Sequence, residues 1–510
     1  MLDAIDNLLN KITMYRLTLY CLLSWWLIAA VFGFAGLLPY SPQMMLFSAL
    51  VITASCLATN AIFARTFKVA ANVESLYITA LILALIITPL KSLNDASGIM
   101  FLVWAGIWAM ASKYLLAINK KHIFNPAAFA VALTSVTLGY SASWWIGGNL
   151  PMLPFVLLGG VLVAKKIIRF DLVLSFLFAA FATIIGFGVS HGSTPLTVAL
   201  QALLHSPLLF FAFIMITEPI TTPPTRSWRM LYGVLAGFLF APAIHVGTVY
   251  STPELALLAG NIFSYLVSPK AKFVLKLKER EKIADGTYSF IFEKDKKMFF
   301  RPGQYMEWTL GHKKPDARGN RRYFTLASSP TEHELMLGIK FYADSSSFKK
   351  SLLSMKVGDE ITVAQLAGDF TLPRNKNEKL AFIAGGIGIT PFRSMLQYLS
   401  DKNEQRPVVL LYSNKTASEI IYKDAFDSAQ KKLGIKTVYT LTDAASIPPR
   451  WSGETGRINE SMIKEKIPDY RERTFYVSGP HSMVAAFEKV LKNVGVKKGR
   501  IKTDFFPGLV

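Results

Sequence analysis

The first half of the chain is almost free of charge, and this property limits what it can fold into. Residues 1–267 hold 13 Lys and Arg and 7 Asp and Glu, whereas residues 268–510 hold 42 and 27. Apolar runs of about 20 residues are long enough to cross the hydrocarbon core of a bilayer as helices. The sequence therefore predicts a polytopic α-helical membrane domain at residues 1–269 and a soluble part at residues 270–510.

Ten low-charge runs predict ten membrane spans. They lie at 17–38, 43–63, 72–90, 98–118, 124–140, 146–164, 170–190, 197–217, 229–249 and 252–268. An even number of spans puts both ends of the domain on one side, and 12 Lys and Arg lie near that side whereas only Lys91 lies near the other. Since cytoplasmic loops are enriched in Lys and Arg, we expect a multi-pass protein of the inner (cytoplasmic) membrane, with both termini and the soluble part in the cytoplasm.

Two polar stretches interrupt the apolar half on the predicted cytoplasmic side. Asn125 and Pro126 are typical of the cap and first residue of a helix, and residues 217–225 read TEPITTPPT. One interpretation is a capped helix start and a proline-rich turn; the other is that Asn125 and Thr221 line a cofactor pocket facing the soluble domain. In each set of five runs the third also ends in a proline-containing segment, which favours an inverted repeat with sites at broken helices.

The motif FNPAA at 124–128 and the run SPLLFFAFIMITEPITTPPT at 206–225 resemble the B subunit of the sodium-translocating NADH:quinone reductase and the D subunit of the Rnf complex. This resemblance implies FMN or riboflavin in the membrane domain. It also makes Thr194 the local match to the position where such subunits attach FMN through its phosphate. Ser193 stands where the usual pattern has alanine, and Gly188 stands near the place of its acid. Covalent and non-covalent binding are therefore both left open.

The soluble part changes from strand alternation to alternating strands and helices. Runs such as FVLKLKE and TYSFIFE predict an antiparallel β-barrel at residues 270–375, and LAFIAG, VVLLYS, KTVYTL and TFYVSG predict a doubly wound α/β domain at residues 376–510. Ligands of such sheets lie at the carboxyl ends of the strands. There the sequence places a glycine turn and further candidates: Gly385, Gly386, Gly388 and Thr390 in the turn, then Ser413, Ser478, Gly479 and Pro480.

Three neighbouring residues of the predicted barrel suit a flavin. Arg322 can pair with a phosphate, Phe324 can pack on a planar ring, and Thr325 can hydrogen-bond the edge of that ring. Ser346 and Ser347 offer hydroxyls and N–H groups for a pyrophosphate. By itself, the Arg322–Thr325 stretch fits an ordinary strand with an exposed arginine equally well.

The motifs RYFT, GGIGITP, SGP and TDFFPG follow one another in the order and spacing of the ferredoxin–NADP reductase superfamily, which residues 270–510 resemble. The resemblance implies FAD at Arg322, Phe324, Thr325 and the serine loop, and a nicotinamide near Thr390 and Gly479. It makes Thr390, Ser478 and Phe505 candidate catalytic residues, with Phe505 or Phe506 covering the flavin. Many members have tyrosine in place of Phe324 and cysteine in place of Ser478. Lys415 favours NADPH slightly over NADH.

These features together predict a membrane-bound oxidoreductase that passes electrons from NAD(P)H through FAD to a membrane flavin, and on to a quinone or an external acceptor. Its partners are then the lipid bilayer and a quinone or redox partner protein. A haem-containing transmembrane reductase and a redox-coupled ion transporter, with Asp171 and Glu218 as candidate ion sites, are the alternatives. Basic residues interspersed with acids argue against nucleic acid, and two cysteines cannot ligate an iron–sulfur cluster; no metal site is predicted.

Overall fold

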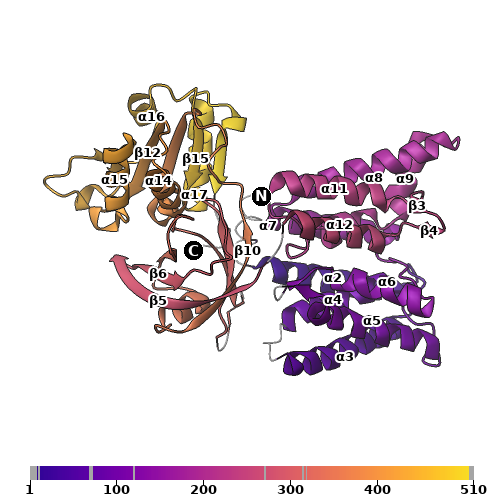
Figure 1. Ribbon diagram of the computed structural model, residues 1–510. Coiled ribbons are helices and arrows are strands. Elements are labelled where there is room, and N and C mark those ends of the chain that lie inside the picture. The colour runs from indigo at the N-terminus through magenta and orange to yellow at the C-terminus, as the bar shows by residue number, and fades with distance from the viewer. Residues whose placement is uncertain are drawn as a thin grey trace. The chain divides into compact units, whose positions relative to one another are not determined.

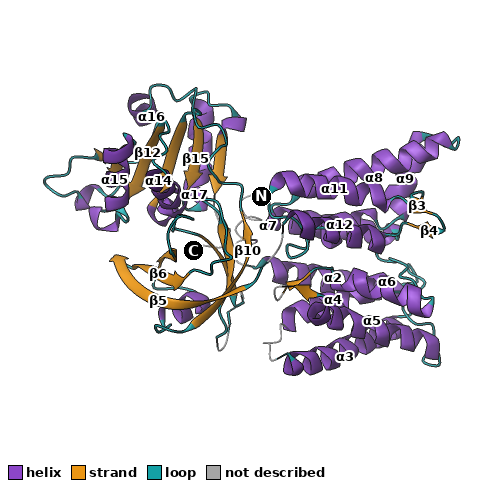
Figure 2. Cartoon of the chain, in the orientation of Figure 1, coloured by secondary structure: helices purple, strands orange, loops and turns teal. Residues whose placement is uncertain are grey.

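The computed structural model describes residues 9, 12–67, 73–118, 121–268, 271–312, 315–316 and 319–504 (Figures 1 and 2). The chain divides into two compact units, residues 1–272 and residues 273–510. The first unit is helical, and the second contains two six-stranded sheets with their helices.

Described helices of the first unit follow the predicted runs closely in position. They are α2 (Met14–Phe34), α3 (Pro42–Thr66), α4 (Val73–Ile86), α5 (Ala96–Leu115), α6 (Pro126–Leu138), α7 (Leu153–Ile167), α8 (Phe170–Ser190), α9 (Pro195–His205), α10 (Leu208–Phe210), α11 (Arg226–Phe240) and α12 (Pro253–Val267). A 3-10 turn η1 (Leu150–Met152) precedes α7, and a π-helical turn η2 (Phe211–Met215) continues α10. Short strand pairs β1 (Ala117–Ile118) with β2 (Lys121–His122), and β3 (His245–Val246) with β4 (Val249–Tyr250), lie in loops.

Five of the described helical segments are long and apolar enough to cross a membrane, which confirms a membrane domain of several spans. A sixth candidate is a bent span, because α9 and the α10–η2 segment meet at 67° across Ser206 and Pro207. Three other apolar helices, α4, α6 and α12, are shorter than a full span. Ten complete spans therefore remain a prediction.

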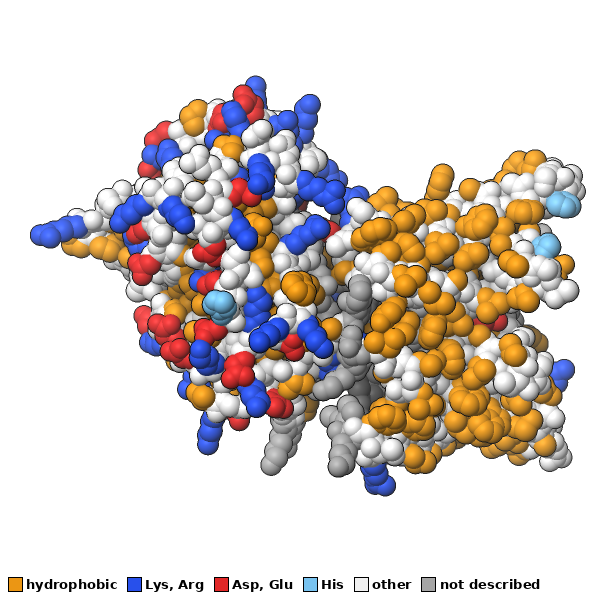
Figure 3. Space-filling view, in the orientation of Figure 1, with side chains coloured by type: hydrophobic (Ala, Val, Ile, Leu, Met, Phe, Trp, Pro, Cys, Tyr) orange, Lys and Arg blue, Asp and Glu red, His pale blue; other side chains and the backbone are white. Residues whose placement is uncertain are grey.

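Apolar side chains cover the outside of this unit as well as its inside. Leu158, Leu174 and Phe178 are between 62% and 76% exposed, although each lies in a long helix. Hydrophobic residues dominate its surface in Figure 3, whereas Lys, Arg, Asp and Glu crowd the second unit. A surface of this kind is stable in lipid rather than in water.

Glycines let α8 and α11 pack backbone to backbone. A Cβ built on Gly233 would lie 2.2 Å from the Ser175 Oγ, and one built on Gly237 would lie 2.4 Å from the Phe176 carbonyl oxygen. The two glycines are four residues apart and so lie on one face of α11. Small residues at this spacing allow the close helix contact that membrane proteins use in place of the hydrophobic effect.

We therefore expect Gly237→Leu to destabilise the helical unit severely, by roughly 3 kcal/mol or more, because backbone atoms of α8 cannot move aside. The measurement is the melting temperature and the monodisperse yield in detergent. Gly186→Leu is the matched control, because nothing lies within 4 Å of a Cβ at Gly186 on the neighbouring α8. Equal losses in both variants would contradict the packing argument.

The first sheet of the second unit is antiparallel, with strand order β8-β7-β10-β5-β6-β9. Its strands are β5 (Phe273–Ala284), β6 (Thr287–Glu293), β7 (Tyr305–Thr309), β8 (Arg321–Thr325), β9 (Glu334–Lys340) and β10 (Glu360–Ala367), and α13 (Ser347–Leu353) lies between β9 and β10. Leu335, Leu337 and Ile339 alternate along β9 and are buried in one core with Phe290 and Trp308. This alternation confirms an antiparallel sheet with one buried face, while closure into a barrel remains a prediction.

The second sheet is parallel, with strand order β14-β13-β12-β11-β15-β16. Its strands are β11 (Leu380–Gly385), β12 (Val408–Asn414), β13 (Lys436–Leu441), β14 (Glu454–Thr455), β15 (Thr474–Ser478) and β16 (Ile501–Asp504), and its helices are α14 (Thr390–Asp401), α15 (Lys423–Leu433), α16 (Glu460–Lys466) and α17 (His481–Asn493). Every residue of β11 and β15 is buried, as expected of central strands with helices on both faces. The predicted α/β sheet is confirmed.

Candidate cofactor-binding sites

The glycine turn lies at the carboxyl end of the central strand β11. Gly385 ends the strand, Gly386 has a φ of +52°, and a single 3-10 turn, η3 (Gly386–Ile389), leads directly into α14 at Thr390. A positive φ is readily adopted only by glycine, and the free N–H groups at the start of α14 attract anions. The local sequence therefore forms the strand, turn and helix that it predicts, and phosphate binding at this turn stays a prediction.

The structure brings this turn against the other predicted nicotinamide residues. A Cβ at Gly388 would lie 2.5 Å from the Ser478 carbonyl oxygen and 2.6 Å from the Gly479 nitrogen. In the sheet register Gly385 is opposite Ser413 on β12, and Ala384 is opposite Ser478 on β15. Three separate stretches of sequence thus meet at one edge of the sheet, and Pro480 caps α17 there.

Arg322 and the serine loop form a second cluster, on the antiparallel sheet. The Arg322 guanidinium donates to the carbonyls of Gly319 and Arg321 and to the Asp316 carboxylate, 3.3 Å away. It also lies over the Phe348 ring, 5.3 Å from its centroid. Backbone carbonyls and a ring thereby fix the direction of the cation.

The carboxylate of Asp316 occupies the centre of this cluster. Asp316 pairs with Arg322 through one oxygen and accepts the backbone N–H of Ser347 through the other, at 3.0 Å. The Ser347 hydroxyl accepts the N–H of Asp316 at 2.9 Å, and Ser346 caps α13 by accepting from Lys349. A guanidinium and a backbone N–H converging on one anion make a set of donors that also fits a phosphate. Sequence reasoning did not identify Asp316.

The two other flavin candidates lie beside this cluster. Phe324 is 7% exposed and packs against Phe348, with ring centroids 6.0 Å apart. Its side chain therefore belongs to the hydrophobic core of the sheet, which leaves little of the ring exposed for stacking on a flavin. Thr325 donates its hydroxyl to Asp504 at 3.5 Å.

Asp504, which the sequence suggests only as part of a motif, connects the two clusters. It ends β16, is opposite Ser478 in the sheet register, and accepts the hydroxyl of Thr325 from the other sheet. Burial raises the pKa of Asp504 to about 7, and the hydrogen bond from Thr325 opposes that rise only partly. Asp504 lies between a predicted flavin residue and a predicted nicotinamide residue. The sequence contains no local signal for this position, because it depends on how the two sheets meet.

The raised pKa of Asp504 predicts a pH-dependent stability. Between its ordinary pKa of 3.8 and about 7 the folded protein holds a proton that the unfolded chain gives up, so this contribution is complete below 3.8 and is lost as pH rises through 7. We expect Asp504→Asn to raise the melting temperature strongly at pH 8.5 and much less at pH 5. Thermal unfolding followed through flavin fluorescence measures this, and equal shifts at both pH values would contradict it.

Hydrogen bonds and an ion pair connect the N-terminal part of α14 to the loop that follows β8 of the antiparallel sheet. Arg393 donates to the carbonyl of Ala327 at 3.2 Å and forms a bidentate ion pair with Glu332. Ser394 donates to the carbonyl of Ser328 at 2.7 Å. These contacts hold the glycine turn and the Arg322–Thr325 strand in one arrangement within the second unit.

In the membrane unit, Glu218 is the centre of a polar cluster. Its carboxylate accepts the Asn125 side-chain amide at 2.9 Å and the Thr221 hydroxyl at 3.1 Å, and it lies 3.7 Å from the His122 Nε2. Asn125 also caps α6 with its side-chain oxygen. The two predicted membrane candidates are thus brought together, through an acid that was predicted only as an ion site.

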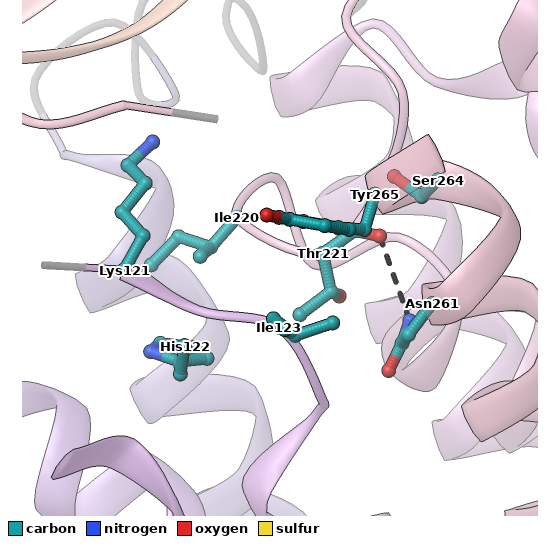
Figure 4. A pocket seen from close by; sticks show the side chains of 8 residues that line it. All are labelled: Lys121, His122, Ile123, Ile220, Thr221, Asn261, Ser264 and Tyr265. Atoms are coloured by element: carbon teal, nitrogen blue, oxygen red, sulfur yellow. Dashed lines mark hydrogen bonds between the residues drawn. The ribbon is translucent and has the colours of Figure 1, made fainter. Parts of the chain in front are cut away.

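A small cavity of about 10 Å³ lies beside Thr221 (Figure 4). Lys121, His122 and Ile123 border it from one side, and Asn261, Ser264 and Tyr265 from α12; Ile220 and Thr221 complete its lining. Asn261 donates to the Thr221 carbonyl at 3.5 Å and accepts the backbone N–H of Asn125 at 2.8 Å. The lining therefore combines hydrogen-bond donors with an aromatic face.

Two arginines hold the loop that carries Glu218 and Thr221. Arg169 donates to the carbonyl of Pro223 at 3.3 Å, and Arg229 donates to that of Pro224 at 2.8 Å. Arg229 also pairs with Asp171 at 2.7 Å. Asp171 therefore orients an arginine, and the structure gives no support to its role as an ion site.

The other predicted positions lie apart from this cavity. Thr194 caps α9 through the N–H of Thr197 and is exposed, so it lies at the opposite end of the bent span from Thr221. Phe505 and Phe506 lie outside the described residues.

Histidines of the described membrane unit lie in short strands or at helix ends. His122 lies in β2, His191 follows α8, His205 ends α9, and His245 lies in β3. Axial haem ligation needs histidines that project from helices toward one another. This arrangement does not fit a haem held between helices.

Two family models match the chain in separate places. The model of the NQR2, RnfD, RnfE family matches residues 146–272, and that of the oxidoreductase NAD-binding domain matches residues 382–489. Both resemblances seen in the sequence are thereby confirmed. The protein is therefore a membrane protein whose second half carries an NAD-binding reductase domain.

Three relatives are similar to part of the chain. The glycine betaine monooxygenase reductase subunit of Chromohalobacter salexigens is 26% identical over 224 residues, covering 43% of this chain and 60% of its own. NADH-cytochrome b5 reductase 1 of Mortierella alpina is 30% identical over 182 residues, covering 35% and 60%. The F subunit of the Na(+)-translocating NADH-quinone reductase of Yersinia pestis is 26% identical over 200 residues, covering 37% and 49%. The chain spans 60% or less of the length of these relatives.

Proposed function

We propose that this protein is a membrane-bound oxidoreductase that passes electrons from NAD(P)H through FAD to a flavin in its membrane unit, and on to a quinone or an external acceptor. One observation carries the proposal: the glycine turn at Gly388 packs against Ser478, which is opposite Asp504, which contacts Thr325 of the flavin strand. A nicotinamide and a flavin held by these two clusters would be neighbours. The reductase domain follows, in the same chain, a membrane domain that matches the model of the NQR2, RnfD, RnfE family.

Each cluster has a distinct task in this proposal. FAD accepts a hydride and can release electrons singly. Arg322 and the N–H of Ser347 bind its phosphates, and Asp316 leaves that position when they do. The start of α14 binds the nucleotide phosphates, Thr390 and Ser478 border the nicotinamide, and Asp504 holds a proton beside Thr325.

The domain assignments follow from these tasks. Residues 1–269 form the transmembrane electron-transfer domain, residues 270–375 the FAD-binding barrel, and residues 376–510 the NAD(P)-binding domain. The membrane domain has ten spans arranged as an inverted repeat, with both termini and the reductase in the cytoplasm. The break at Ser206 and Pro207 in the third span of the second set is the kind of discontinuous helix that such repeats contain.

The lining of the small cavity beside Thr221 is the proposed contact site for the polar edge of a membrane flavin. Lys121, His122 and Asn261 supply donors for the polar edge of a flavin ring, and Tyr265 supplies an aromatic face. Asn125 and Thr221 keep the cavity in shape through Glu218. Thr194 is the proposed attachment position of a second flavin, at the other end of the bent span.

Extraction of the cofactors with and without denaturation tests the proposal. We expect one FAD per chain to be released, together with FMN or riboflavin, and a modified Thr194 peptide in the mass spectrum if attachment is covalent. Vesicles containing the protein should oxidise NAD(P)H when a quinone is supplied. A Soret band without flavin would favour a haem reductase instead, and ion uptake in step with oxidation would add transport to the function.

A further inference from the structure

Tyr422 occupies an unusual backbone position where the two sheets of the second unit meet. Its φ is +58° and its ψ is 24°, the left-handed region, although it is neither glycine nor asparagine. Bulky residues avoid this region unless the surrounding contacts compensate for the strain. The contacts of the Tyr422 side chain must therefore compensate for this backbone strain.

The side chain of Tyr422 reaches the antiparallel sheet and fills the space above a glycine. A Cβ built on Gly338 of β9 would lie 2.6 Å from the Tyr422 hydroxyl oxygen and 3.0 Å from the Thr390 Cγ2. Gly338 is opposite Ser289 in the sheet, and the hydroxyls of Ser289 and Tyr422 are both buried. Replacing this glycine would push both Tyr422 and Thr390 away.

Arg393 keeps the Tyr422 ring in this place. Its guanidinium lies 5.7 Å from the ring centroid and also forms an ion pair with Glu332, in the loop between β8 and β9 of the antiparallel sheet. Tyr422, Arg393 and Thr390 thus form one layer between the glycine turn and β9. Thr390 begins α14, and Met336 of β9 accepts the backbone N–H of Ala327, two residues after the flavin strand β8, at 2.9 Å; the thickness of this layer therefore sets how far the turn lies from that strand.

We propose that Tyr422 is a positioning residue for hydride transfer: its hydroxyl, seated over Gly338, sets the distance between the Thr390 turn and the flavin. This inference rests on the proposed reductase function. It adds a residue, and a pair contact between sheets, that the sequence motifs do not contain. It also gives a reason for a strained tyrosine at the start of α15.

The test uses full-length protein in detergent and anaerobic stopped-flow reduction of its FAD, with whichever of NADH and NADPH reduces the wild type faster. Gly338→Ala is expected to lower the limiting reduction rate constant about 10- to 100-fold, because a shift near 1 Å is enough for such a loss. The Kd for the nucleotide and the FAD content should change less than threefold. A general loss of structure would change all three quantities.

A second substitution that restores the reduction rate of Gly338→Ala is the decisive experiment. In the double variant Gly338→Ala with Tyr422→Phe the clashing oxygen is gone, and most of the lost rate should return. Gly499→Ala is the control, since nothing lies within 4 Å of a Cβ there. A second route is Tyr422→Asn, which tolerates the left-handed backbone but lacks the ring; it should slow reduction at least tenfold without loss of FAD.

The outcomes separate the inference from the function on which it rests. A wild type reduced by NAD(P)H, with Gly338→Ala equally fast or not rescued by Tyr422→Phe, would overturn the positioning role alone. Normal reduction in Tyr422→Asn would overturn it as well. A wild-type FAD that neither nucleotide reduces would overturn the proposed function, and the positioning role with it.

Discussion

Arg322→Ala is expected to purify without FAD. The guanidinium is the cation of the anion-binding cluster and is held in direction by two backbone carbonyls and the Phe348 ring. Loss of two charge-assisted hydrogen bonds, at about 1.5 kcal/mol each, would raise the Kd for FAD about 100-fold. The substitution also leaves the Asp316 carboxylate near the phosphate position without its cation, which adds repulsion.

The measurement is the ratio of FAD to polypeptide after gel filtration, with FAD separated from FMN and riboflavin by chromatography. Arg322→Lys should give an intermediate loss, because lysine keeps the charge but not the planar fork. Arg301→Ala is the control for general loss of positive charge, since Arg301 is exposed on the same unit. Full FAD occupancy in Arg322→Ala would remove this cluster from the cofactor site.

The sequence predicts the elements well because each has a local cause. Charge-poor runs locate the membrane helices, and the run of buried residues in β11 followed by glycines locates the turn before α14. These signals depend on residues that are close in the chain. Apolar residues that recur every 2 positions indicate a strand, and those that recur every 3.6 positions indicate a helix. The order of the two sheets follows from the same patterns.

Contacts between distant segments are not readable in this way. Asp316, Glu218 and Asp504 each join residues that are predicted separately, and their roles depend on which strands and loops become neighbours. An isolated acid in a sequence is most often a solvated surface residue. Phe324 shows the converse, because its side chain is largely committed to the core beside Phe348.

The shape of a membrane span is also not predictable from the hydropathy of its sequence. The run at 197–217 has the composition of one straight span, but the helix breaks between His205 and Leu208 and then passes through a π-helical turn before Glu218. Proline at position 207 lacks an N–H and interrupts the ladder, while the π turn shifts the residues that follow. Hydropathy measures the length of an apolar run and does not see this bend.

Gly388→Ala is expected to block reduction of the flavin by NAD(P)H while FAD stays bound. The new Cβ would meet the Ser478 carbonyl oxygen at 2.5 Å and the Gly479 Cα and nitrogen at 2.6 Å, which are backbone atoms and cannot rotate aside. Normal contact needs about 1 Å more, so η3 and the loop after β15 must separate. A displacement of that size at the nicotinamide position should lower the reduction rate constant about 100-fold.

Gly499→Ala is the control for a general effect of adding a methyl group to the α/β domain. Nothing lies within 4 Å of a Cβ built on Gly499, so reduction should stay within a few fold of the wild type. Stopped-flow reduction of both variants, with the FAD content measured in parallel, gives the comparison. If Gly388→Ala reduces its flavin as fast as Gly499→Ala, the turn between β11 and α14 is not where the nicotinamide binds, and the hydride must enter from another face of the sheet.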